Sequence, residues 1–153
     1  MGTNEELMAE IKVATKAAKK TFLGTGVSDD VIDRAQEVLG LHFSTGVRMF
    51  LRAHSGGVVR GKELYGINSP PDAPMPGADL VYMTQTLRKN GLDPWWLPIY
   101  DDQGDRTYFV DCDVSVDEEG KVYVEDLELE PKWRIVAPNY LEFVLDVIRG
   151  SIR

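Results

Sequence analysis

The sequence predicts a mixed fold in which helices cover an antiparallel meander of strands, and three observations support this. Apolar residues recur every three or four positions over several capped stretches, which is typical of amphipathic helices. The segments Ile99-Tyr100, Thr107–Asp113 and Lys121–Glu125 have strand patterns. Acidic turns at 101–105 and 117–120 separate these segments, so neighbouring strands are expected to run in opposite directions.

Length and composition favour one ordinary globular domain. The chain has 153 residues, of which 43% are apolar and 27% are charged. We expect one domain over 1–153, with an N-terminal helix and linker over 1–26 and a core over 27–150. A chain of this length buries enough surface to fold without a metal or a disulfide.

Cys112 is the only cysteine, so the chain can form neither an intrachain disulfide nor a four-cysteine zinc site. It lies in a strand pattern between Asp111 and Asp113, and these two carboxylates would raise the pKa of its thiol. We therefore expect a buried, unreactive thiol rather than a nucleophile.

The net charge of −8 limits the classes of partner. An acidic surface repels nucleic-acid phosphates and anionic lipids and attracts basic proteins, so neither a nucleic acid nor a membrane is expected as a partner. No apolar run reaches membrane-spanning length and the N-terminal segment lacks a signal-peptide core, so a cytoplasmic location is expected. The charge could also serve solubility alone, and this alternative stays open.

The first predicted helix carries one apolar stripe, which Gly24 and Gly26 follow. The stripe consists of Leu7, Ile11, Ala14, Ala18 and Phe22. Because charged residues lie largely off it, we expect the stripe to pack against the core.

Two further helices follow, each with a clear beginning and end. Ser28 is a good N-cap for the first of them, and Gly40 can end it in a left-handed conformation. Ser44 can cap the second, which Ser55-Gly56-Gly57 ends. A strand is expected over Glu63–Ile67.

The second half of the chain adds a long loop and two helices. Prolines interrupt 69–77, which predicts a surface loop, and Asp79 can cap the helix that follows. The last helix is expected from Asn139 to Ile148, with Trp133, Ile135 and Val136 leading into it. Its apolar face consists of Tyr140, Phe143, Val144, Val147 and Ile148.

Trp95 and Trp96 lie in a stiff, aromatic segment between two prolines. The sequence leaves two alternatives open. The rings can pack beneath the sheet, or one of them can stand exposed as a binding anchor.

The sequence contains no recognisable catalytic motif. His42 and His54 lie near Ser44 and Ser55, which would suit a small hydrolase, but both serines occupy positions typical of caps and turns. This hydrolase is the weakest alternative, and we expect no enzymatic activity.

Metal and cofactor motifs are also missing from the sequence. Asp101, Asp102 and Asp105 do not match the register of a calcium-binding loop, so a hairpin turn is expected instead. The glycine clusters at 24–26 and 55–57 do not follow the pattern of a phosphate-binding loop. We therefore expect neither a metal nor a cofactor.

Acidic residues dominate the predicted hairpins. Between 101 and 130 the only basic residues are Arg106 and Lys121. The acids are Asp101, Asp102, Asp105, Asp111, Asp113, Asp117, Glu118, Glu119, Glu125, Asp126, Glu128 and Glu130. Charge of one sign speeds the encounter with a basic partner, although a merely solvated sheet face is the alternative.

The order of these signals resembles the SMI1/KNR4 family, also called the SUKH superfamily, from about Val27 to Ile148. The resemblance depends on the following segments together: Ile32 through Gly40, Phe50-Leu51 followed by Gly56-Gly57, Leu64-Tyr65-Gly66, Asp105 through Asp111, Gly120 to Val124, and Tyr140-Leu141-Glu142-Phe143-Val144. It implies an α+β fold with helices packed on a central, mainly antiparallel sheet.

The resemblance also implies a function. Bacterial members of that family look like immunity proteins that bind and neutralise a cognate polymorphic toxin, often a nuclease with a basic cleft. A regulatory scaffold or adaptor is the alternative that the resemblance leaves open. We expect a basic protein partner at the acidic hairpins, through Asp101, Asp102, Asp105, Asp117, Glu118 and Glu119, with Trp95, Trp96 or Tyr100 as anchors.

Overall fold

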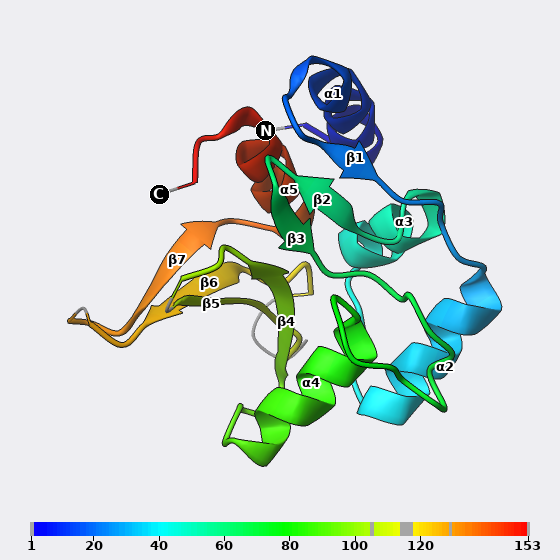
Figure 1. Cartoon of the computed structure of the whole chain (residues 1–153), viewed down its shortest axis with the longest axis vertical. Coiled ribbons are helices and arrows are strands. Elements are labelled where there is room, and N and C mark those ends of the chain that lie inside the picture. Colours follow the sequence, from blue (N-terminus) through cyan, green and yellow to red (C-terminus); the bar gives the residue numbers. More distant parts are fainter. Residues whose placement is uncertain (1, 105, 114–117, 129, 153) are drawn as a thin grey trace.

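Within the residues that the computed structural model describes, five helices accompany a seven-stranded antiparallel sheet, which confirms the expected α+β class (Figure 1). The structure describes residues 2–104, 106–113, 118–128 and 130–152. Its helices are α1 (Asn4–Ala17), α2 (Asp29–Leu39), α3 (Thr45–Ala53), α4 (Leu80–Lys89) and α5 (Tyr140–Arg149). Its strands are β1 (Phe22–Leu23), β2 (Gly57–Val59), β3 (Lys62–Leu64), β4 (Trp96–Asp101), β5 (Arg106–Asp111), β6 (Val122–Asp126) and β7 (Trp133–Ala137).

The sheet is a simple meander in which each strand pairs with its neighbour in sequence, from β1 to β7. The longest ladder joins β5 to β6, with Tyr108 opposite Val124 and Phe109 opposite Tyr123. Because side chains alternate between the two faces of a strand, this register places Tyr108 and Phe109 on opposite faces of the sheet. The meander expected from the acidic turns is confirmed.

Side-chain caps fix where the helices begin, as the sequence predicts. The Ser28 and Ser44 hydroxyls accept hydrogen bonds from the backbone N–H groups of Val31 and Val47. The Asn139 side chain does the same for α5, and Gly40 ends α2 in a left-handed conformation.

The main hydrophobic core lies between α5 and the inner face of the sheet. The Phe143 ring of α5 lies 5.8 Å from Tyr100 and 5.6 Å from Tyr108, measured between ring centroids. Tyr140 packs edge-on against Phe50 of α3 at 5.6 Å. Figure 1 shows α1 beside α5, while α2 and α4 lie toward the other side of the molecule.

Asp79 attaches the proline-rich loop to the start of α4. One carboxylate oxygen accepts from the Tyr82 N–H at 2.9 Å and caps the helix. The other oxygen accepts from the Asn68 N–H at 2.9 Å and from the Ser69 hydroxyl at 2.8 Å. The residues of 69–77 form no helix or strand, so the expected loop is confirmed.

Two expectations about regular elements are wrong. Phe22 does not continue the stripe of the first helix, because α1 ends at Ala17 and Phe22 pairs with Val58 in the short strand β1, where it is 73% exposed. The residues before the last helix form strand β7, because Trp133 and Ile135 pair with Glu125 and Tyr123 of β6. In both segments the conformation depends on a pairing partner that lies elsewhere in the sequence.

Among the described residues, no helix is long and apolar enough to cross a membrane.

Candidate functional site

The structure divides the predicted acidic surface into two groups at opposite ends of the sheet. Asp101 ends β4 and Asp102 begins the turn to β5, whereas Glu118 and Glu119 lie in the turn between β5 and β6. Strand β5 separates these turns by about 17 Å, at about 3.3 Å per residue. Asp105 and Asp117 lie outside the described residues. Of the predicted acidic residues that the structure describes, those of the two turns therefore lie at separate ends of the sheet.

At the first end, backbone contacts hold the carboxylates of the turn in place. Asp101 accepts from the Gln103 N–H at 2.8 Å, and Asp102 accepts from the Gly104 N–H at 2.9 Å. These bonds are typical of Asx turns and confirm the predicted hairpin.

A polar cleft of about 750 Å³ lies beside this turn, where the ends of β3 to β6 meet the end of α5. On its wall Arg106 lies 3.5 Å from the carboxylate of Asp126, which is only 9% exposed. The Tyr108 hydroxyl donates to Asp102 at 3.3 Å. Part of the acidic charge predicted here is thus compensated within the protein, with Lys62 and Arg60 also on the lining.

At the second end, the two glutamates differ in exposure. Glu118 is exposed, whereas Glu119 is half-buried and approaches the first turn of α3 near Gly46. A carboxylate there is favourable because the N-terminal end of a helix carries partial positive charge. Glu118 is therefore the freer of the two for contact with a partner.

The structure separates the three predicted aromatic anchors. Tyr100 belongs to the main core and is 7% exposed, so it offers little surface to a partner. Trp95 is 48% exposed, and Trp96 is half-buried on the opposite face of the sheet from the main core. The Trp96 ring stacks on Phe109 at 3.9 Å.

Trp96 belongs to a group of side chains that the sequence reasoning did not bring together. We define the aromatic face as Trp96, Phe109, Tyr123, Leu127, Trp133 and Ile135, on the outer side of strands β4 to β7 and the turn after β6. Alternation along Tyr108–Asp111 and along Trp133–Ala137 was the available signal. The second segment was not predicted as a strand, because it was interpreted as the lead into the last helix.

Contacts within the aromatic face order its rings. Phe109 is 1% exposed, with Trp96 stacked on it and Tyr123 at 5.7 Å. Trp133 meets Trp96 edge-on at 5.2 Å, and its indole Nε1–H donates to Glu125 at 2.8 Å. The rings thus form a small cluster that is separate from the main core.

A groove of about 280 Å³ borders the aromatic face at the end of α4. Leu87 and Leu92 line one side, and Trp96, Thr107, Glu125 and Leu127 line the other. The groove joins apolar surface to one carboxylate, which suits a mixed side chain such as that of lysine or arginine.

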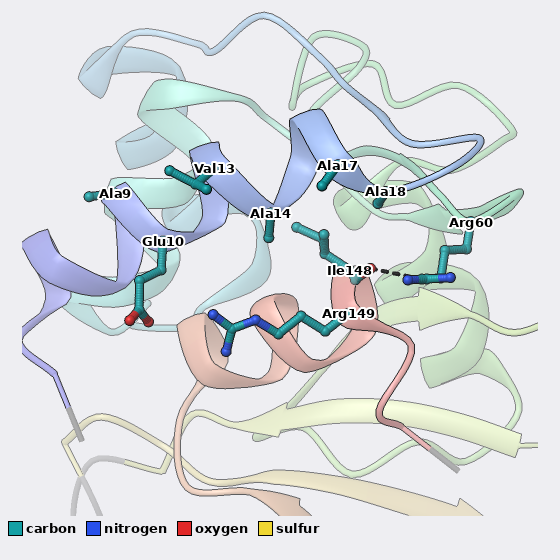
Figure 2. Close-up of a pocket in the computed structure, with 9 residues that line it drawn as sticks. All are labelled: Ala9, Glu10, Val13, Ala14, Ala17, Ala18, Arg60, Ile148 and Arg149. Carbon is teal, nitrogen blue, oxygen red and sulfur yellow. Dashed lines mark hydrogen bonds between the residues drawn. The ribbon is translucent and has the colours of Figure 1, made fainter.

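A second hollow, of about 540 Å³, lies between α1 and α5 (Figure 2). Its lining is mostly alanine and Val13 from α1, with Ile148 and Arg149 from α5. Arg60 closes one end, where its Nε donates to the Ile148 carbonyl at 2.7 Å. This bond satisfies a carbonyl at the end of α5, so Arg60 has a structural role.

Both serines considered for a hydrolase are engaged with the backbone. Ser44 caps α3, and the Ser55 hydroxyl accepts from the Ile67 N–H at 2.9 Å and donates to the Ile67 carbonyl at 3.2 Å. His54 packs on Phe50 at 5.3 Å, and burial lowers its pKa. This arrangement does not build the nucleophile and base that a hydrolase needs.

Cys112 has the predicted character. It is buried, and burial together with the charge of Asp111 raises the pKa of its thiol to about 12. A thiol with this pKa is almost entirely protonated at neutral pH and is a poor nucleophile. Within the described ranges, no three His, Cys, Asp or Glu side chains lie close enough together to hold a metal ion.

Comparison with known families is consistent with this architecture. The SUKH_5 family, described as SMI1-KNR4 cell-wall, matches residues 5–149. No curated protein matches the chain. Because the match covers nearly the whole sequence, the chain belongs to the SMI1-KNR4 family of the SUKH type.

Proposed function

We propose that this SMI1-KNR4 family protein is an immunity protein, which binds a basic toxin and blocks the toxin's active site. The family includes immunity proteins. The single observation that carries the proposal beyond the family is the net charge of −8, with carboxylates in the turns at both ends of the sheet. We propose that the protein acts by binding and not by catalysis.

The charge suits an inhibitor of an enzyme that holds a polyanion. A nuclease needs a basic cleft to bind phosphates, and an acidic protein can occupy that cleft through complementary charge. A field of one sign also raises the rate of association, which matters for a protein that must act before the toxin does damage. Asp101, at the end of β4, and the exposed Glu118 carry this charge at the two ends of strand β5.

The test begins with the reading frames beside the gene of this chain, whose products are expressed and screened for toxicity. We expect co-expression to protect cells from the toxin, and the two purified proteins to form a complex whose association rate falls as salt is raised. The double variant Asp101→Asn/Asp102→Asn should slow association, because asparagine keeps the turn hydrogen bonds but removes the charge. Glu118→Gln tests the opposite end in the same way.

The results that would reject the proposal are equally direct. Absence of both protection and complex formation would exclude immunity toward that toxin. Binding of several unrelated proteins without protection would favour the scaffold or adaptor alternative. Turnover of a substrate by the purified chain would contradict a function by binding alone.

A further inference from the structure

We propose that the aromatic face is the surface on which a basic protein partner docks, with Trp133 and Ile135 as its anchors. This inference depends on the proposed function, since the partner is the toxin domain. It moves the contact from the tips of the hairpins to the outer side of the strands that the hairpins join.

Exposure of large apolar side chains is the first observation that supports this site. Leu127 is 64% exposed, Trp133 is 51% exposed and Ile135 is 54% exposed. Trp133 and Ile135 lie two residues apart on one face of β7, opposite Glu125 and Tyr123 of β6. Neighbouring exposed apolar residues on an otherwise polar surface mark an interaction site more often than scattered ones do.

The order of the rings before binding is the second observation. Trp96, Phe109 and Tyr123 hold one another by stacking, and Trp96 holds Trp133 by an edge contact. The Trp133 N–H is already satisfied by Glu125, so the indole can be covered without leaving a buried donor unpaired. A surface ordered in advance loses little conformational entropy on binding, which favours affinity.

Strand β7 presents these anchors at an edge of the sheet. It is the last strand in the order β1 to β7 and pairs with β6 on one side (Figure 1). A partner can therefore approach Trp133 and Ile135 from the outer face and from the edge. Large side chains that a partner covers completely contribute most of the binding energy in protein interfaces, and tryptophan is prominent among them.

The charge around the aromatic face indicates which partner fits it. Asp111 and Glu125 lie on the same side of the strands as the rings, and the exposed Glu118 and Glu130 lie in the turns at the two ends. The basic residues on the same strands and turns are Lys121, Lys132 and Arg134, and Arg134 pairs with Val124 on the other face of β7 from the rings. An apolar centre with a mainly acidic border complements a basic protein that carries an apolar patch.

A second copy of this chain is the less favourable occupant. Two chains of net charge −8 repel each other, and the acidic border would face itself across a two-fold axis. The structure therefore favours a basic heterologous partner over self-association at this face.

The test compares single substitutions on the aromatic face with substitutions at equally exposed apolar residues elsewhere. Trp133→Ala and Ile135→Ser remove the anchors, and Phe22→Ser and Val13→Ser serve as controls, at residues 73% and 70% exposed. The probe is the purified toxin domain identified in the screen of neighbouring reading frames, and dissociation constants are measured by calorimetry. Urea unfolding shows that each variant is folded; Ile135→Ser keeps the test valid if Trp133→Ala disturbs the ring cluster.

We expect each anchor substitution to weaken binding by about thirtyfold or more, mainly through faster dissociation. We expect the controls to bind within about twofold of the unsubstituted chain. If the unsubstituted chain binds and both anchor variants bind equally well, the docking site is wrong and the proposed function stands. If the unsubstituted chain does not bind, both proposals fail. If sedimentation shows a dimer that the anchor substitutions dissociate, the face is occupied by a second copy and the inference is overturned.

Discussion

Substitution of Asp79 tests how the structure holds its longest loop. Its carboxylate accepts one hydrogen bond from the first turn of α4 and two from the loop side, at Asn68 and Ser69. Asp79→Ala removes all three acceptors. Asp79→Asn can keep the helix cap, because asparagine is as good an N-cap as aspartate. It then turns an NH₂ group toward two donors, which leaves them without an acceptor.

The expected losses in unfolding free energy distinguish a residue that only caps α4 from one that also holds the loop. Loss of a cap costs about 1 kcal/mol, and a hydrogen bond to a charged group contributes about 1.5–3 kcal/mol when its donor is buried. Because Asn68 is exposed and Ser69 is half-buried, water can replace part of the lost hydrogen bonding. We therefore expect Asp79→Ala to lower the free energy of unfolding by about 3 kcal/mol. We expect Asp79→Asn to lower the free energy of unfolding by about 2 kcal/mol, because only the bonds to Asn68 and Ser69 are lost.

Urea unfolding followed by tryptophan fluorescence measures both values, and the melting temperature should fall by about 6–12 °C for Asp79→Ala. Ser28→Ala is the matched control, because Ser28 caps α2 with one exposed bond of 3.4 Å. It should cost about 1 kcal/mol. If Asp79→Asn unfolds at the same urea concentration as the unsubstituted chain, Asp79 is only a helix cap and the loop does not depend on it.

Two further predictions concern titration. Burial raises the pKa of Tyr100 to about 12, so the unfolded chain releases this proton near pH 10 while the folded chain keeps it. The stability that the protonated Tyr100 contributes should therefore be fully present below pH 10 and be lost as pH rises toward 12. Tyr100→Phe should make the decline in unfolding free energy over this range shallower; an unchanged slope would contradict this. The pKa of the Cys112 thiol, also raised to about 12, predicts on the order of a thousandfold less thiolate than in an ordinary cysteine at pH 8. A thiol reagent should label the folded chain only as fast as it opens, and rapid labelling without denaturant would refute the buried position.

The sequence was most informative where a local interaction decides the structure. The hydroxyls of Ser28 and Ser44 and the amide of Asn139 cap helices within three residues of their own positions, so the pattern alone located α2, α3 and α5. Gly40 ended α2 for a reason that is also local, since a left-handed conformation suits glycine. The turn carboxylates of Asp101 and Asp102 bind the backbone two residues later, which explains why that hairpin was recognised.

The parts that sequence reasoning missed depend on contacts between distant residues. Phe22 follows the helical spacing of the stripe before it, yet its pairing with Val58 determines its conformation. The aromatic face arises because β4, β5, β6 and β7 bring Trp96, Phe109, Tyr123 and Trp133 onto one side. The four rings lie far apart in the sequence, so no short local pattern contains them all, and only the strand register brings them together.

Charge and aromatic surface have different physical roles in the proposed interaction, and this difference makes the two proposals separable. Carboxylates such as the half-buried Asp101 and the exposed Glu118 act at a distance, so their removal should lower the association rate, and salt should mask the effect. Trp133 and Ile135 act only on contact, so their removal should raise the dissociation rate at any ionic strength. If the carboxylate variants instead raised the dissociation rate, and the Trp133 and Ile135 variants changed only the association rate, the contact would lie at the hairpin tips. The exposed aromatic rings would then have no function in binding.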